Sequence, residues 1–392
     1  ITNGKDILAG NFDVITKNVY SYVESTQPFA NHHWFYGVIA YLMHHAIGFS
    51  GMAVFKTILF LTTFSLLFRV ALKHADFWLV SFFSIPTILI LLGRGDLRPE
   101  AFSYFFIVFF IVLLTKFEEN PNLNKIFLLI PIQLIWVNTH LYFPIGILIV
   151  AGFLIEHIII NYRQIKESKI IRKLSYLLAG ISLTIFLNPY GLVGIIKSII
   201  VNKNPDFPIS SAELGSLTNV FKYSPKIDNP SAVLFGYLVI ILTASFVVAL
   251  VFRWKKKQPL LSNHYLFYLV ASIATIILGF NIIRSLPLFG LIFLLAISNN
   301  LQGIFIELKI WISKKSVYLI NFLSPALILL LIFIPLIYLT FFARPILSPY
   351  NYIGIGLTLR AEDSANFFIE NGLEGPIFND TDIGSYLIYY LH

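Results

Sequence analysis

Four charged residues stand close together in a chain that carries few charges. Arg94, Asp96, Arg98 and Glu100 fall within the stretch GRGDLRPEAFSY, whereas only 12% of the 392 residues are charged. An arginine offers a planar fork of donors that pairs with phosphate or carboxylate oxygens, so the stretch predicts an anion-binding site. The alternative is that Arg94 and Arg98 pair with the neighbouring acids or reach lipid headgroups. Pro99 and Glu100 also suit the first turn of a following helix.

Three further stretches place polar side chains in short turns between apolar runs. WVNTHLYF contains Asn138 and His140, FNIIRSLP contains Arg284, and PFANHHWFY contains His32 and His33. Arg284 has no acid beside it in the sequence, and such an arginine in a tight turn between apolar segments predicts a functional residue. His140 has the alternative reading of a hydrogen-bonded interfacial residue. No HExxH motif or nearby carboxylate accompanies the paired histidines, so no cofactor is predicted and a divalent metal is left open.

Composition predicts a membrane protein that crosses the bilayer several times. Hydrophobic residues make up 57% of the chain, and long apolar runs recur along it. The net charge of +8 falls mostly in short hydrophilic loops, which is typical of membrane topology and argues against a nucleic-acid partner. The chain has no Cys, which excludes disulfides and thiolate metal sites.

The apolar segments predict about ten transmembrane helices that position the polar turns. They lie near 50–72, 76–93, 101–116, 126–138, 141–160, 174–187, 231–252, 264–281, 285–299 and 317–341. Lysines and arginines cluster in alternate loops, and the positive-inside bias places those loops in the cytoplasm. The polar turns and both chain ends then lie outside. The predicted location is the cytoplasmic membrane, with an extracytoplasmic active face.

Two segments are predicted to lie on a membrane surface without crossing it. Residues 34–49 form a short run in which His44 and His45 would be costly inside hydrocarbon, so we expect an interfacial helix on the outer side. Residues 300–316 mix Glu and Lys with Ile, Phe and Trp, which predicts an amphipathic helix on the cytoplasmic side.

The predicted fold class is an all-α polytopic membrane protein in three parts. Residues 1–49 form an extracytoplasmic first loop, 50–341 a transmembrane helical domain, and 342–392 a linker with the start of a small extracytoplasmic α/β domain. In that domain we expect a helix that begins near Asp363 and ends at Gly372, followed by a strand at PIFND. The chain does not begin with Met and stops within the apolar run GSYLIYYLH, so we expect a fragment of a longer protein.

Five stretches follow one another along most of the chain in a recognisable order. They are ITNGKDILAGNFDVITKNVYSYV, PFANHHWFYGVIAYL, GRGDLRPEAFSY, IWVNTHLYFPIG and GPIFNDTDIGSYLIYYL. Together they resemble bacterial multi-pass proteins related to the GT-C glycosyltransferases. The resemblance implies inverting transfer of a sugar from a polyprenyl-phosphate carrier to an extracytoplasmic envelope acceptor. The partners it implies are that sugar donor, membrane lipids and the acceptor.

The resemblance also implies roles for individual residues. In that group a catalytic acid lies in the first outer loop, in a stretch that would precede Ile1, so Asp6 and Asp13 are the acidic candidates within this chain. Asn18 and His33 stand where the group carries acids. Arg94, Arg98 and Arg284 would hold the donor phosphate. The full predicted substrate-binding set is Arg94, Asp96, Arg98, Asn138, His140, Arg284, His32 and His33.

Two other functions are left open by the sequence. A transporter or flippase of a lipid-linked glycan would use the same arginines for passive phosphate binding. It would be expected to carry repeats, or charged and broken helices near the middle of the membrane, and neither is visible. The polar residues cluster instead at one end of the predicted spans, which favours an enzyme. A non-catalytic membrane scaffold is the third reading.

Overall fold

The computed structural model describes residues 1–20, 29–94, 97–191, 216–217, 230–259, 264–315, 362–375, 377 and 381–392. Within these ranges every regular element is a helix, and none of these residues forms a strand. The all-α fold class is therefore confirmed for the described part of the chain.

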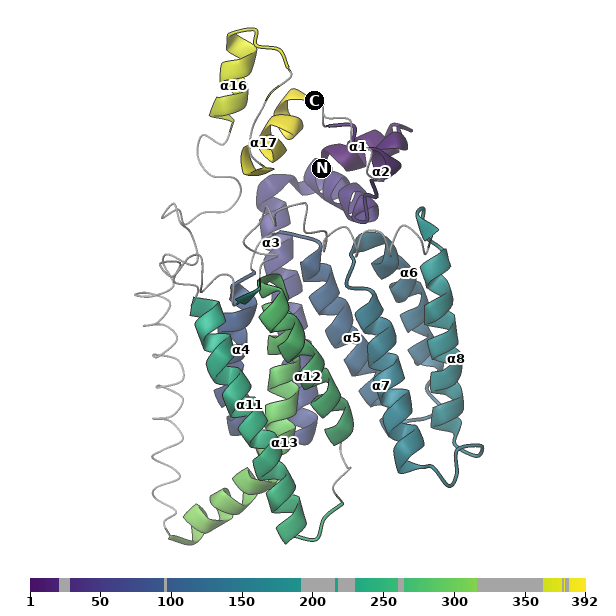
Figure 1. Ribbon diagram of the computed structural model, residues 1–392, viewed down its shortest axis with the longest axis vertical. Helices are drawn as coiled ribbons and strands as arrows, with labels where there is room; N and C mark the ends of the chain where they lie inside the picture. The colour runs from purple at the N-terminus through teal and green to yellow at the C-terminus, as the bar shows by residue number, and fades with distance from the viewer. Residues whose placement is uncertain are drawn as a thin grey trace.

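Long helices run up and down in one bundle, and short helices lie beyond one of its ends (Figure 1). The bundle contains α3 (Trp34–His74), α4 (Phe77–Leu92), α5 (Glu100–Glu119), α6 (Leu129–Thr139), α7 (Pro144–Ile160), α8 (Lys169–Leu183), α11 (Pro230–Lys255), α12 (Tyr265–Asn281) and α13 (Leu286–Lys315). The short helices are α1 (Thr2–Leu8), α2 (Asp13–Thr16), α16 (Asp363–Glu370) and α17 (Thr381–Leu391). Three 3₁₀ turns, η1 (Asn124–Leu128), η2 (Thr184–Phe186) and η4 (Ile283–Ser285), lie in connections.

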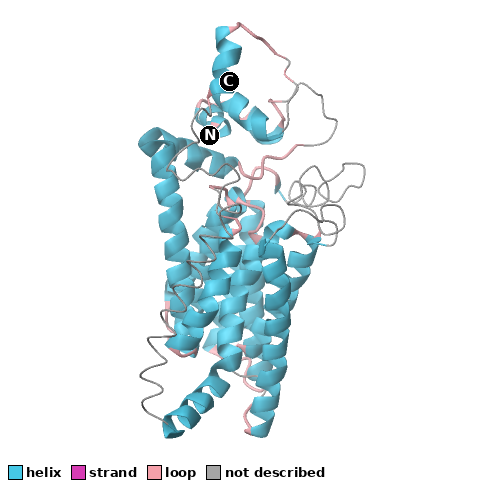
Figure 2. Ribbon diagram, turned by 90° about the vertical axis from the view of Figure 1, so that its left-hand side faces the viewer, coloured by secondary structure: helices cyan, strands magenta, loops and turns pink. Residues whose placement is uncertain are grey.

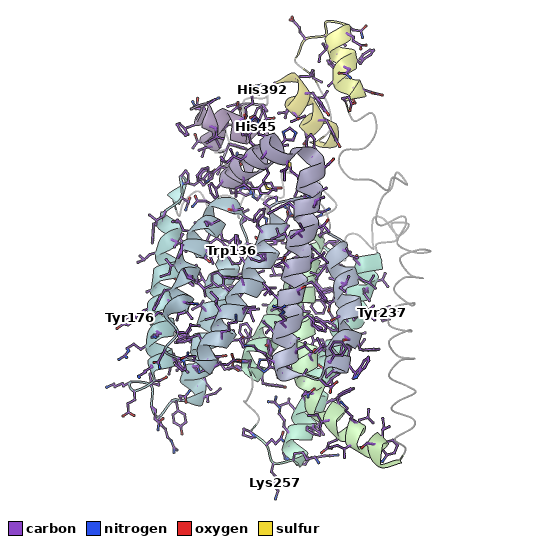
Figure 3. The ribbon with its side chains drawn as sticks, turned by 180° about the vertical axis from the view of Figure 1, so that it is seen from behind. His45, Trp136, Tyr176, Tyr237, Lys257 and His392 are labelled. Atoms are coloured by element: carbon purple, nitrogen blue, oxygen red, sulfur yellow. The ribbon has the colours of Figure 1, made fainter. Side chains whose placement is uncertain are left out.

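The two ends of the bundle differ in what they carry. We call the end with α1, α2 and α17 the N-terminal end; Figure 2 shows these helices standing beyond the bundle. The opposite end, where Figure 3 labels Lys257, is the Lys257 end. Between them, α13 packs against α4, α11 and α12, while α5 packs against α3 and α7, and α7 packs against α8. The Lys/Arg-rich connections α7–α8 and α11–α12 share the Lys257 end (Figure 1).

Local sequence signals start several of these helices. Asp76 caps α4, because its side chain accepts a hydrogen bond from Trp78 N at 3.0 Å. Ser168 caps α8 in the same way through Ile171 N at 3.3 Å. Pro144 occupies the first turn of α7, where a missing N–H costs nothing.

The outer surface of the bundle is apolar. Ile240 is 68% exposed and Leu148 is 66% exposed. Tyr176 and Tyr237 point outward from the bundle (Figure 3). Exposed apolar surface of this extent is unusual on a water-soluble protein and typical of one that faces lipid.

Four of the described helices are long and apolar enough to cross a membrane, judged by length and composition: Trp34–His74, Glu100–Glu119, Ser231–Lys255 and Ile283–Ser313. Phe77–Leu92, Pro144–Ile160 and Tyr265–Asn281 are apolar but shorter than the roughly 20 residues of a straight span. The prediction of ten spans is therefore not supported. Its segments up to residue 299 fall on helices, several of which are too short, and 317–341 lies outside the described residues. The structure supports the coarser class, an all-α membrane protein.

α3 consists of two helical stretches joined at Gly48, which has φ 63° and ψ −177°. In Figure 1 the stretch before Gly48 lies across the N-terminal end, and the stretch after it descends beside α5. The break agrees with the prediction of a separate surface helix at 34–49 and falls close to the predicted boundary after residue 49. The position of this helix relative to a membrane stays a prediction.

Replacing Gly48 by alanine is expected to destabilise the protein by about 1–3 kcal/mol, because this backbone conformation is essentially confined to glycine. A Cβ at Gly48 would meet no atom within 4 Å, so the cost is one of backbone strain alone. Gly236 is the matched control: it lies inside α11, a Cβ there is equally free, and Gly236→Ala should stabilise by about 0.5–1 kcal/mol. Thermal unfolding in detergent measures both changes; equal shifts would contradict a strained kink.

Two predictions near the C-terminus need correction. Residues 300–315 continue α13 as one helix, since no proline interrupts it, and do not form the separate helix predicted at 300–316. The predicted helix near Asp363 is α16, and Gly372 follows its end with φ 59°. Of the predicted strand PIFND only Ile377 is described, and it is not in a strand. The described residues of 342–392 thus form two short helices and give no α/β domain.

Candidate functional site

A buried carboxylate stands at the N-terminal end of the bundle. Glu100, the first residue of α5, has a side chain that is 3% exposed. Its Oε1 accepts hydrogen bonds from Arg94 Nη2 at 3.1 Å and from Arg284 Nε at 2.5 Å. The ion pairs connect the end of α4, the start of α5 and η4. Three segments that are distant in the sequence therefore meet at one carboxylate, and its N-terminal place on α5 adds the favourable helix dipole.

The second oxygen of this carboxylate has a different environment. Glu100 Oε2 is buried and accepts no hydrogen bond from any residue that the structure describes. A buried carboxylate oxygen without a donor costs free energy, so it is an attractive place for a ligand hydroxyl or a water. Arg284 is 24% exposed and so provides the more open side of this site.

The predicted arginine cluster forms only in part. Arg94 and Arg284 come together at Glu100, whereas Arg98 lines a separate cavity that involves Tyr386 of α17. Asp96 lies outside the described residues. Arg284, which has no acid beside it in the sequence, is nevertheless paired, because Glu100 lies 184 positions away in the sequence and next to it in space.

Three histidines gather near Arg284, whose charge acts on all of them. The His33 and His140 rings stack with centroids 5.1 Å apart, and the His32 and His33 centroids are 4.1 Å apart. His140 Nδ1 lies 2.8 Å from Ser103 Oγ, which also accepts a hydrogen bond from Trp136 Nε1 at 2.8 Å. Since the indole supplies one proton to Ser103, the serine hydroxyl can donate its own to Nδ1. His140 then carries its proton on Nε2.

Burial keeps these imidazoles neutral. It lowers the pKa of His33 to about 3, with His32 as the second cause, and it holds the pKa of His140 well below the usual range. Burial likewise lowers the pKa of His32. The charge of Arg284 acts in the same direction on all three. Neutral imidazoles with such low pKa values are hydrogen-bonding groups at pH 7, not strong bases.

Asn138 serves as a brace between elements. Its Oδ1 accepts from Trp34 Nε1 at 3.1 Å, and its Nδ2 donates to the carbonyl oxygens of Leu134 and Leu187 at 2.9 and 3.1 Å. It therefore ties the start of α3 to the end of α6 and to η2. The predicted role as a cavity-lining residue is compatible with this position, but its amide is already engaged.

The two predicted acids of the N-terminal segment lie apart from the described partners of Glu100. Asp13 is exposed on α2 and pairs with Lys17 at 2.9 Å. Asp6 accepts a hydrogen bond from Tyr20 OH at 2.6 Å and lies 3.5 Å from His392 Nε2. Asp6 thus connects α1 to Tyr20 and His392, whereas the pair of Asp13 with Lys17 is a local contact at the end of α2. Among the described residues, no three or more His, Asp or Glu side chains are arranged so that they could hold a metal ion, and this includes His32 and His33.

Sequence reasoning missed the centre of the site. Glu100 was explained by the helix dipole and, in the alternative reading, as a partner of the neighbouring arginines, which its pair with Arg94 confirms. Ser103, Trp136 and Tyr142 were not singled out. The spacing of Trp136, Asn138 and His140 in one turn was the available signal for the second half of the site. Tyr142 packs edge-on to His140 with ring centroids 4.4 Å apart, and burial raises its pKa to about 12.

A second charged cluster, the Lys257-end cluster, consists of Glu118, Glu156, His157 and His264. Glu118 pairs with His157 Nε2 at 2.6 Å and with His264 Nε2 at 3.1 Å. His264 Nδ1 also lies 3.1 Å from Glu156, whose other oxygen accepts from Leu266 N at 3.1 Å. The cluster therefore ties α5 and α7 to the N-terminus of α12.

An apolar groove extends along the bundle. It lies between α7 and α12, with α13 behind it, and has a volume of about 510 Å³. Its lining includes Leu148, Gly152, Ile155, Val270, Ala274 and Leu278. Toward one end it is lined by Leu288, which follows η4 and Arg284, and toward the other by Ile155 and Leu266, next to Glu156.

These features define the class of protein: a membrane protein that is all-helical in its described part, with a buried, charged site at each end of its bundle. No family model, curated protein or solved structure matches the chain, so no family follows from comparison.

Proposed function

We propose that the protein is a membrane glycosyltransferase that moves a sugar from a polyprenyl-phosphate carrier to an acceptor on the outer side of the cytoplasmic membrane. The observation that carries this proposal is the convergence of Arg94 and Arg284 on Glu100. Leu288, four positions after Arg284, lines the apolar groove. A carrier of this kind has an anionic head and a long apolar chain. The order of sequence motifs that resembles GT-C enzymes supports the same reaction.

Arg284 is the residue best placed to receive the phosphate. Its Nε and Nη2 contact Glu100, and its side chain is partly exposed. The guanidinium has five N–H donors, so Nη1 can reach a phosphate oxygen while Glu100 fixes the plane of the group. The leaving polyprenyl phosphate gains negative charge in the transition state, and a cation already held in place stabilises that charge. Glu100 Oε2 can accept a hydrogen bond from a sugar hydroxyl.

A second candidate is a flippase of the lipid-linked glycan. The observation that favours it is the Lys257-end cluster, in which Glu156 accepts a hydrogen bond from the backbone of Leu266, a residue that lines the same groove. A protein that moves a polar head across the membrane needs polar groups on both sides. The distinguishing result is chemical: a flippase moves the carrier lipid without forming a new glycosidic bond.

The transfer assay uses the full chain in lipid nanodiscs with a radiolabelled polyprenyl-phosphate sugar and membrane extract as acceptor. Arg284→Gln is expected to lower the rate by roughly 100-fold, the usual loss when one preorganised donor to developing charge is removed. Arg284→Lys should be intermediate, since it keeps the charge and loses the fork. Arg172→Gln, an exposed arginine on α8, is the control and should keep full activity.

Thermal unfolding of each variant separates lost activity from lost structure. A folded Arg284→Gln protein with unchanged transfer would contradict the phosphate role. If the wild-type protein transfers no label to the acceptor but moves the labelled lipid to the opposite leaflet of liposomes, the flippase is the correct function and the transferase proposal fails.

A further inference from the structure

A second cavity lies at the N-terminal end, separate from the contacts of Glu100. It has a volume of about 620 Å³, opens to the surface and is bordered by α1, the kinked part of α3, residues 97–98 and α17. Its lining includes Asn3, Tyr20, Arg98, Ser385, Tyr386 and Tyr389. None of these residues has a role in the phosphate site proposed above.

The position of α17 over this cavity is held by specific contacts. Tyr389 OH and His44 Nε2 are 3.1 Å apart, and the Tyr389 ring packs edge-on to Phe49 with centroids 5.4 Å apart. At the end of the helix, the His392 ring packs edge-on to Tyr20 at 5.1 Å. Figure 3 labels His392 and His45 close to each other at this end. The C-terminal helix therefore forms a wall of the cavity together with the N-terminal helices.

The chemistry of the lining combines aromatic rings with small polar groups. Tyr20, Tyr386 and Tyr389 contribute ring faces and edges, and Asn3 and Ser385 contribute an amide and a hydroxyl. A sugar ring has the matching character, because its C–H face packs on an aromatic ring while its hydroxyls exchange hydrogen bonds at the edge. Tyrosine suits such a role, since it is large, rigid and polar at one end.

The charged side chain in the lining of the cavity is positive. Among the described residues that line the cavity, Arg98 is the one with a charged side chain. A guanidinium recognises a carboxylate or phosphate through paired N–H donors. The ligand that complements this surface is therefore anionic as well as rich in hydroxyl groups.

The cavity is connected to the phosphate site through the backbone. Leu97 and Arg98 line the cavity, and Glu100 follows two positions later. Tyr36 OH donates to Leu97 O at 3.1 Å and so fixes this segment to α3. A ligand in the cavity would thus lie next to the segment that presents Glu100.

We infer that this cavity, between α17 and the N-terminal helices, is a binding site for an acidic saccharide, with Arg98 as its anion-recognising residue. On the proposed transferase function, on which this assignment rests, the saccharide is the acceptor. The assignment moves Arg98 from the donor phosphate, where the sequence analysis placed it, to a different ligand.

The test measures binding without any sugar donor, so its failure is distinguishable from failure of the transfer reaction. The full chain in zwitterionic nanodiscs is titrated calorimetrically with a disaccharide that carries one glucuronic acid, and with the methyl ester of the same disaccharide. The acid is expected to bind roughly tenfold more tightly than the ester, as one charge-assisted contact provides. Arg98→Gln should abolish this preference, and Tyr386→Ala should weaken binding of both forms.

Controls keep the result independent of folding. Ser385→Trp, which fills the cavity from an exposed helix, should abolish binding of both forms without lowering the unfolding temperature. Tyr237→Ala, on the outer face of α11, should change neither affinity. Equal affinities for acid and ester, or an unchanged preference in Arg98→Gln, would overturn the assignment. The assignment would also be overturned if neither disaccharide bound and vesicles of anionic phospholipid occupied the site at Arg98. The cavity would then be a site for a lipid headgroup.

Discussion

Replacing Glu100 by glutamine is expected to lower the free energy of unfolding by about 3–5 kcal/mol. The side chain is 3% exposed and its Oε1 is shared by Arg94 and Arg284. Removing the negative charge takes the shared anionic partner away from two partly buried guanidinium groups, which is the costly way to break a buried ion pair. Chemical denaturation of the detergent-solubilised protein, followed by tryptophan fluorescence, measures the change.

Glu119→Gln is the matched control for this variant. Glu119 lies on the same helix and pairs with Lys73 at 2.8 Å, but its side chain is 60% exposed, so the loss should be under about 1 kcal/mol. A second comparison combines Glu100→Gln with Arg284→Gln. Because both changes remove the same pair, the double variant should lose less than the sum of the single variants. Similar losses for Glu100→Gln and Glu119→Gln would show that the charged centre at Glu100 contributes little.

Stability is expected to fall between about pH 6.5 and pH 9 because of His264. Its hydrogen bonds to Glu118 and Glu156 outweigh the effect of burial and raise its pKa to about 9. A histidine with a raised pKa in the folded protein contributes its full stabilisation below the unfolded value, and this is lost as pH rises through the folded value. At about 1.4 kcal/mol per pKa unit, the contribution is about 3 kcal/mol.

The groups that face His264 belong to several helices. Glu118 of α5 and Glu156 of α7 contact it directly, His74 of α3 has its ring centroid 5.7 Å away, and Tyr268 of α12 packs edge-on at 6.1 Å. His157 shares Glu118 with it. These contacts explain why loss of the proton should loosen the junction of α5, α7 and α12 at the Lys257 end.

The measurement is the unfolding temperature as a function of pH. The wild-type protein should lose stability between pH 6.5 and 9, whereas His264→Gln should be less stable at pH 6.5 and nearly independent of pH over this window. His45→Gln, an exposed histidine of α3, should follow the wild-type curve. Parallel curves for wild type and His264→Gln would contradict a protonated His264 in the folded state.

Local structure could be read from the sequence to a large extent. The apolar runs up to residue 299 fall on helices, the segment 34–49 is set apart by the kink at Gly48, and Gly372 follows the end of α16. These features depend on hydrophobicity, turn chemistry and glycine backbone freedom, all of which act over a few residues. Helix length could not be predicted, because an apolar run does not show whether its helix is long enough to cross a membrane.

The pairing of polar groups could not be read in the same way. The sequence placed Arg94, His140 and Arg284 at one end of the helices, but it did not show that Arg284 pairs with Glu100 or that His33 stacks on His140. Arg98 stands four positions from Arg94 and lines another cavity. Which side chains meet depends on how the helices rotate and pack against one another. Composition and local signals thus determine that this chain forms membrane helices with polar ends, and only tertiary packing, which joins residues more than 100 positions apart, decides which of those polar groups form a site.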